Sequence, residues 1–188
     1  MWPRRRSGGA AAGTARGAGG AGEAFESGGD AQAPPLTVAQ LRARAIALLA
    51  RREHSRVELE RKLARHSTDT GRITQVLDQL QVEKLLSDQR FAEGVVRVRG
   101  ARYGSMRVAQ DLRARGVAGE LASTLVTGLK ASEAERALEI WQRKFGGPPL
   151  DGAERARQMR FLQARGFAAE VIRRVVPRAK AGTEDDPE

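Results

Sequence analysis

The sequence predicts an all-α protein made of three tandem three-helix repeats, and two observations lead to this fold class. From Leu36 to Pro177, apolar residues recur at the spacing of a helix face, and no stretch alternates apolar and polar residues for long enough to form a strand. The chain also resembles itself at a period of about 50 residues. Because one such unit barely holds a core, we expect the three to stack into an elongated, curved body with a continuous core.

The internal similarity is clearest between the second and third repeats. A segment that begins at Leu112 recurs 50 residues later at Leu162, and both copies read Leu-x-Ala-Arg-Gly followed by an apolar residue. Gly116 and Gly166 in these segments are expected to close a helix in the left-handed conformation. A weaker copy surrounds Leu63, which lies 49 residues before Leu112. A single helical bundle with accidental similarities is the alternative interpretation.

The first repeat is predicted over residues 36–82. Its first helix is expected over residues 38–53, and its second helix ends near Leu63. Apolar residues at i, i+3, i+4 and i+7 give the third helix one buried face, which consists of Ile73, Val76, Leu77 and Leu80.

The second repeat is predicted over residues 83–130. Ser87 stands where a helix begins, and its hydroxyl oxygen can accept a hydrogen bond from a free N–H group of the first turn. The helix that follows is expected to bury an apolar stripe, which consists of Phe91, Val95 and Val98.

The third repeat is predicted over residues 131–178. Ser132 and Glu135 have the spacing of a capping box at the start of its first helix. This helix is expected to bury a stripe that consists of Leu138, Trp141 and Phe145. The Gly/Pro-rich segment 146–151 is interpreted as a linker to the second helix, and Pro177 as the end of the third.

Two terminal segments lie outside the repeats. Residues 1–35 are rich in Gly and Ala and have no periodic apolar face, so we expect a disordered tail. Residues 179–188 form an acidic C-terminal tail, since residues 181–188 contain four acidic residues and no basic one.

The net charge of the chain favours an acidic partner. The sequence holds 33 Lys and Arg residues against 23 Asp and Glu residues, and residues 36–180 hold 29 basic and 16 acidic residues, a net charge of +13. Nucleic acid is the commonest partner of such a basic body. The alternative is an Arg-rich composition imposed by codon bias, because 28 of the 33 basic residues are Arg.

Several classes of function find no support in the sequence. The chain has no Cys, no apolar run long enough to span a membrane, and no apolar segment after Arg5-Arg6 that would make an export signal, so we expect a cytoplasmic protein. His54 and His66 are interpreted as solvated surface residues, and Ser55, Ser87, Ser105 and Ser132 as helix caps. We therefore expect no enzyme activity, no catalytic or metal site and no cofactor.

The candidate contact residues form a basic cluster in the second repeat. Arg side chains suit phosphates and surface carboxylates, and Tyr103 stands in a connection between helices where its ring can stack on a partner. The candidates for contact with a filament or DNA are Arg90, Arg97, Arg99, Arg102, Tyr103, Arg107, Arg113 and Arg115. The alternative is a solvated face with local ion pairs, such as Arg107 with Asp111 at i and i+4. Trp141 is interpreted as a core residue.

Short motifs follow one another in a fixed order along residues 41–177. The first repeat carries the run of residues 47–59, followed by Lys62-Leu63. The second repeat carries residues 86–93, then Arg97, Arg99, Gly104, Arg107-Val108, Asp111-Leu112 and Gly116-Val117. The third repeat carries Lys144-Phe145-Gly146, Arg160-Phe161-Leu162 and Arg165-Gly166-Phe167. Each motif is weak alone, but in this order they resemble the RecX family of bacterial regulatory proteins.

The resemblance implies a fold, a partner and a function. The fold is three tandem three-helix repeats, and the partner is the RecA recombinase filament on DNA, with further contacts to single- or double-stranded DNA through basic faces. The implied function is inhibition of ATP hydrolysis and strand exchange by RecA in recombination, DNA repair and the SOS response, by a protein that is expected to be monomeric. The alternative is a general DNA-binding helical-repeat protein that needs no protein partner. The resemblance does not cover residues 1–35.

Overall fold

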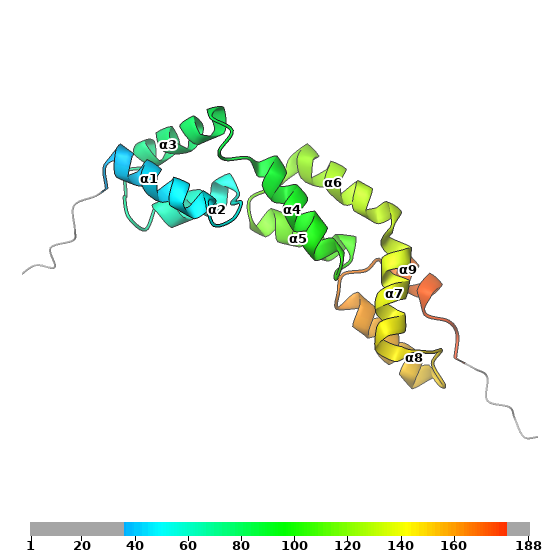
Figure 1. Ribbon diagram of the computed structural model, residues 1–188. Helices are drawn as coiled ribbons and strands as arrows, with labels where there is room; N and C mark the ends of the chain where they lie inside the picture. The colour runs from blue at the N-terminus through cyan, green and yellow to red at the C-terminus, as the bar shows by residue number, and fades with distance from the viewer. Residues whose placement is uncertain (1–35, 180–188) are drawn as a thin grey trace, which may run out of the picture. The chain divides into compact units, whose positions relative to one another are not determined.

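The computed structural model describes residues 36–179, which form nine α-helices and no strand (Figure 1). The two terminal segments predicted as tails lie outside the described residues, apart from Ala179. We call α1–α3 repeat 1, α4–α6 repeat 2 and α7–α9 repeat 3. The helices are α1 (Val38–Leu49), α2 (Arg56–Leu63), α3 (Thr70–Val82), α4 (Asp88–Gly100), α5 (Ser105–Ala114), α6 (Gly119–Ala131), α7 (Glu133–Phe145), α8 (Gly152–Gln163) and α9 (Ala169–Val175).

Repeat 1 forms as the apolar periodicity predicts. Each of its helices begins with a side-chain cap, in which Thr37, Ser55 and Asp69 accept hydrogen bonds from backbone N–H groups of the first turn. The predicted face of α3 is fully buried, and it packs on α1 and α2. The core of repeat 1 consists of Leu41, Ala45, Leu59, Leu63, Ile73, Val76, Leu77, Leu80 and Leu86.

Repeat 2 has a core that differs in one position from the predicted stripe. Ser87 caps α4 as predicted, since its Oγ accepts a hydrogen bond from the backbone N of Arg90 at 3.3 Å. Phe91 is buried, but Val98 is 65% exposed, so its assignment to the core was wrong. The reason is that α4 turns Ala92 and Gly100 inward, and a Cβ at Gly100 would lie only 2.7 Å from Leu129 of α6.

Repeat 3 buries Trp141, as predicted. Trp141 is 7% exposed, and its Nε1 donates a hydrogen bond of 2.7 Å to Oε1 of the buried Gln158. Leu138 is 39% exposed, against the prediction, because α7 packs on α8 and α9 through Ala137 and the partly buried Ile140 instead.

The capping box predicted at Ser132 does not form. The hydroxyl of Ser132 makes no cap and instead accepts a hydrogen bond from Nε of Arg136. The acidic residue next to it, Glu133, is 2% exposed and binds Ser105 at the start of α5. α7 follows α6 after a single residue, so tertiary contacts replace a cap at this end.

The predicted register of the repeats is confirmed. Leu63, Leu112 and Leu162 are all fully buried, and each lies near the end of the second helix of its repeat. Gly116 and Gly166 have φ angles of +82° and +78°, the left-handed conformation expected where a glycine closes a helix.

The same two glycine turns also join successive repeats. At junction 1, between repeats 1 and 2, Oγ of Ser55 donates a hydrogen bond of 2.5 Å to the carbonyl of Arg115, next to Gly116. At junction 2, between repeats 2 and 3, the backbone N of Gly104 donates to the carbonyl of Arg165 at 2.9 Å. Because Arg165 stands 50 residues after Arg115, the two junctions use equivalent turns of successive repeats.

The repeats do not share a continuous core, contrary to expectation. Buried apolar side chains form three clusters, one within each repeat. Polar contacts link repeats 1 and 2 at junction 1, where the guanidinium of Arg90 pairs with Glu53 at 2.7 Å and the carboxylate of Asp88 accepts from the backbone N of Arg56 at 2.8 Å. Among the helices of residues 36–179, none combines the length and apolar character needed to cross a membrane.

Candidate binding surface

The structure divides the predicted basic cluster into residues that hold the fold and residues that stay exposed. Arg90 belongs to the first group, because it pairs with Glu53 and also donates to the backbone carbonyls of Lys84 and Leu85 at 3.0 and 3.2 Å. Arg115 pairs with Glu58 across junction 1 at 3.2 Å. These two arginines stabilise the arrangement of repeats 1 and 2.

Asp111 engages two further candidates. Arg99 forms an ion pair with its Oδ2 at 3.0 Å, and Arg107 approaches its Oδ1 to 3.9 Å. The guanidinium of Arg99 also lies 5.2 Å from the ring centroid of Tyr103. The local ion pair expected between Arg107 and Asp111 is therefore present, with Arg99 as the nearer partner.

The remaining three arginines are exposed, and their side chains have no hydrogen-bond or ion-pair partner within residues 36–179. Arg97 lies on α4, and Arg102 lies in the turn between α4 and α5. Arg113 lines a hollow of about 230 Å³ between α5 and α6. Of the predicted cluster, Arg102 and Tyr103 alone line the groove described next.

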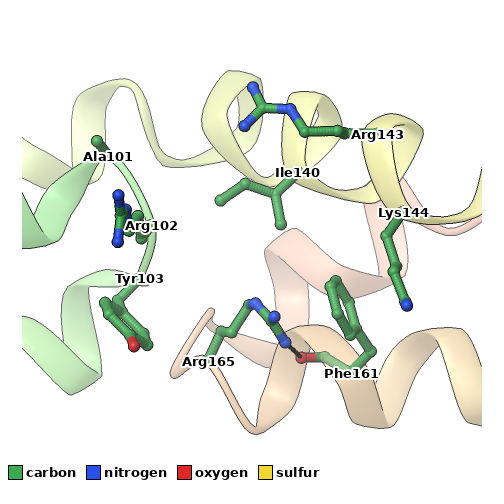
Figure 2. A pocket seen from close by; sticks show the side chains of 8 residues that line it. All are labelled: Ala101, Arg102, Tyr103, Ile140, Arg143, Lys144, Phe161 and Arg165. Carbon is green, nitrogen blue, oxygen red and sulfur yellow. Dashed lines mark hydrogen bonds between the residues drawn. The ribbon is translucent and has the colours of Figure 1, made fainter.

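A groove of about 440 Å³ lies where the turn between α4 and α5 faces α7 and α8 (Figure 2). Four of its lining residues are cationic, and none is acidic. Figure 2 shows Arg102 and Tyr103 on one wall, with the side chains of repeat 3 on the other. The lining residues are Ala101, Arg102, Tyr103, Ile140, Arg143, Lys144, Phe161 and Arg165.

Arg165 forms part of a stack in the wall of the groove. Its guanidinium carbon lies 3.6 Å from the ring centroid of Phe161, and its Nη1 donates a hydrogen bond of 3.3 Å to the carbonyl of Phe161 (Figure 2). Phe161 in turn packs edge-to-face with Phe145, with ring centroids 5.1 Å apart. These contacts hold the guanidinium plane in one orientation.

Two charged residues of α7 fix the two walls of the groove relative to each other. The carboxylate of Glu133 accepts from the backbone N of Ser105 at 2.8 Å and from its Oγ at 2.9 Å. Arg136 donates to the carbonyl of Tyr103 at 3.1 Å and also to the carbonyl of Gly100. Burial lowers the pKa of Arg136, and the negative charge of Glu133 opposes that shift.

Sequence reasoning missed the half of the groove that repeat 3 contributes. Arg143, Lys144 and Arg165 were absent from the candidate list because they lie about 40 to 60 residues from Arg102, and only the contacts of junction 2 bring them close. The available signal was the 50-residue offset between Arg115 and Arg165, which indicates that these two arginines occupy equivalent turns of successive repeats.

His54 was wrongly assigned to the solvated surface. It is 3% exposed at junction 1, and its Nδ1 lies 3.1 Å from Oε2 of Glu58. Burial is the main reason why the pKa of His54 lies below its ordinary value, and the positive charge of Arg52 adds to this effect. Burial alone would raise the pKa of Glu58, but hydrogen bonds from Arg52 and His54 and the charge of Arg115 bring that pKa below its usual range. Within residues 36–179, no cluster of three residues that could ligate a metal is found.

The lowered pKa of His54 predicts that the protein loses stability on mild acidification. Above the ordinary His pKa of 6.5, His54 is neutral in both the folded and the unfolded chain. As the pH falls from about 7 to about 5, the unfolded chain binds this proton first, so the free energy of unfolding decreases. Denaturant titrations across this pH range should show the decrease, and His54→Asn should flatten it. Equal curves for the parent and His54→Asn would contradict the assignment.

Comparison with known protein families gives a consistent match along the described chain. Models of three successive domains match in order: "RecX, first three-helix domain" over residues 42–80, "RecX, second three-helix domain" over residues 87–125, and "RecX, third three-helix domain" over residues 131–176.

Curated relatives and a solved structure agree with these matches. The "Regulatory protein RecX" of Ralstonia nicotianae is 44% identical over 154 residues, which cover 82% of this chain and 97% of the relative. That of Leptothrix cholodnii is 46% identical over 136 residues, which cover 72% and 87%. The crystal structure of RecX from Lactobacillus salivarius superposes with a TM-score of 0.65 at 17% identity, covers 73% of this chain and 93% of that one, and shares the fold.

Proposed function

This chain belongs to the RecX family, and from that premise we propose that it binds the RecA–DNA filament and inhibits its ATP hydrolysis and strand exchange. The observation that carries the proposal is the match of all three domains in order. It is supported by relatives that are named regulatory proteins and that align with this chain over nearly their whole length. The family is not a family of enzymes. We therefore propose that the protein acts by binding. We also propose that it does so in the cytoplasm and as a monomer.

The charges of the chain support a partner that contains nucleic acid. Residues 36–180 carry a net charge of +13, and several exposed arginines have no partner within the described residues. Among the predicted contact residues, we propose that Arg97, Arg102 and Arg113 face the filament. Arg90, Arg99 and Arg115 are engaged in ion pairs within the fold, so they are poorer candidates.

A second candidate function is DNA binding without a protein partner, which the same exposed cations favour. The two functions differ in their salt dependence. Each Arg–phosphate contact on single-stranded DNA makes affinity fall with salt, with a log–log slope of about 0.7 per contact. A filament regulator also contacts protein, so part of its binding energy survives screening.

We expect tighter and less salt-sensitive binding to a RecA filament than to naked single-stranded DNA, and suppressed ATP hydrolysis by the filament. Salt titrations of affinity on both substrates, with an ATP hydrolysis assay beside them, measure this difference. Replacing Arg97, Arg102 and Arg113 by Ala should weaken inhibition by about tenfold or more, since each lost contact to a charged group is worth on the order of 1 kcal/mol.

The matched control replaces Arg44, Arg51 and Arg65 by Ala. These are exposed arginines of repeat 1 that make no side-chain ion pair within residues 36–179, so the control removes the same charge elsewhere. Equal affinities and slopes on the two substrates, with ATP hydrolysis unchanged, would contradict the regulator and leave the DNA-binding protein. Equal inhibition by the two triple variants would contradict the choice of contact residues alone.

A further inference from the structure

The groove between repeats 2 and 3 holds a concentration of positive charge that the fold itself does not use. Arg102, Arg143 and Lys144 are exposed and have no side-chain hydrogen bond or ion pair within the described residues. Elsewhere, arginines such as Arg90 and Arg115 are held in ion pairs. Cations that face one hollow without an acidic residue raise the local potential, so the groove attracts an anionic ligand.

The groove also holds a flat, fixed surface beside these charges. The guanidinium of Arg165 is stacked on Phe161 at 3.6 Å and tied to the carbonyl of the same residue. A stacked guanidinium keeps a second planar face, and nucleic-acid bases stack on both aromatic rings and Arg planes. A carboxylate-rich peptide would use the charges of the groove but not this plane.

The two walls are already in place before any ligand binds. Glu133 and Arg136 tie α7 to the turn that carries Arg102, and the backbone N of Met106 donates to the carbonyl of Gly166 at 3.2 Å. A site whose walls are held by hydrogen bonds avoids part of the ordering cost of binding. Its volume of about 440 Å³ lies in the range of ordinary small-ligand pockets.

We propose that this groove is a binding site for single-stranded nucleic acid. Arg102, Arg143 and Lys144 bind phosphates, and one base stacks on the plane of Arg165. Paired bases in a duplex are stacked on their neighbours and do not offer a free face, so the site selects single strands without selecting a sequence. The inference rests on the proposed function only for its role, in which the groove, Arg102 included, contacts the DNA of the filament while other parts of the chain contact RecA; the site itself is tested without RecA.

The test uses the full chain and a fluorescently labelled thymidine oligonucleotide, with affinity measured by anisotropy at several salt concentrations. Arg102→Ala/Arg143→Ala/Lys144→Ala should bind at least about tenfold more weakly, and its log–log salt slope should fall by about 2, which is three contacts at about 0.7 each. Arg44→Ala/Arg51→Ala/Arg65→Ala removes the same charge from repeat 1 and should change affinity by less than about threefold.

A second variant separates stacking from charge. Arg165→Lys keeps the positive charge but removes the planar face, so it should weaken binding by about fivefold or more without changing the salt slope. An oligonucleotide that contains 2-aminopurine should lose the fluorescence quenching that stacking on the parent protein causes. Unchanged thermal melting of Arg165→Lys would show that the loss does not come from unfolding.

Four results would overturn the site. The first two are binding of the oligonucleotide by the groove variant as tight as by the parent, and equal weakening by the two triple variants. The others are binding of duplex DNA as tight as binding of single strands, and competition by an oligoglutamate peptide at the concentration at which the oligonucleotide itself competes. The proposed function is judged separately, by inhibition of filament ATP hydrolysis. If the groove variant binds the oligonucleotide like the parent, the site is wrong but the proposed regulation of RecA is not affected. If the parent binds the oligonucleotide through the groove but does not inhibit RecA, the site stands and the proposed function is wrong.

Discussion

Replacing Gly104 by Ala is expected to disrupt junction 2 and to lower the free energy of unfolding by about 3 kcal/mol or more. A Cβ at this position would lie 2.2 Å from the carbonyl oxygen of Gly166 and 2.4 Å from the backbone N of Phe167. These are backbone atoms of repeat 3, which cannot rotate away as a side chain can. The φ angle of Gly104 is −72°, which Ala adopts without strain, so the whole effect comes from the close approach of two repeats.

The structure offers a matched control for this prediction. Gly94 and Gly128 lie inside α4 and α6, and a Cβ at either position would meet nothing within 4 Å. Ala at these positions should stabilise the protein by about 0.5–1 kcal/mol, because Gly is a poor helix former. Trp141, the one tryptophan of the described residues, reports the unfolding of repeat 3 by its fluorescence. Gly104→Ala with the denaturation midpoint of the parent would show that the two backbones are not in contact.

Replacing Arg136 by Ala is expected to destabilise the protein by about 3 kcal/mol. The guanidinium donates to three carbonyls, those of Gly100, Tyr103 and Leu129, and so joins the ends of α4 and α6 to α7. Its removal leaves these acceptors without a donor and leaves the buried carboxylate of Glu133 without a neighbouring positive charge.

The Arg136 prediction is checked by denaturant titration against two other variants. Arg160→Ala removes an exposed arginine of α8 that makes no side-chain hydrogen bond or ion pair within residues 36–179, and should change stability by less than about 0.5 kcal/mol. Arg136→Lys should fall between the parent and Arg136→Ala, because one ammonium group cannot reach carbonyls on separate helices as a planar fork does. A loss as small as that of Arg160→Ala would show that these hydrogen bonds do not hold the junction.

The sequence predicts the elements of this fold well because the relevant signals are local. Leu112 and Leu162 are buried at equivalent positions, and Gly116 and Gly166 adopt left-handed φ angles, since a helix end is determined by a few neighbouring residues. The face of a helix near its end is less predictable. Val98 fits an apolar stripe but is exposed, because the packing of α5 and α6 determines which side of α4 is buried.

The candidate site was predicted only in part, and for a different reason. A charge count along the sequence selects arginines that are close in sequence. Such arginines can pair with an acidic residue of the same segment, as Arg99 and Arg107 do with Asp111. The groove instead draws on Arg102 from one repeat and Arg143 from the next. The burial of His54 was missed as well, because it lies in the connection between α1 and α2, where no helical periodicity indicates which side chains point inward.

The separation of the cores has a consequence for how such a protein changes length in evolution. Each repeat closes its own apolar cluster, and each junction uses the same turn, at Arg115-Gly116 and again 50 residues later. Gain or loss of a unit by gene duplication or deletion therefore leaves every remaining core intact and changes the number of junctions by one. The length of such a protein can therefore change by whole repeats. It does not need the compensating core substitutions that lengthening a single bundle would require.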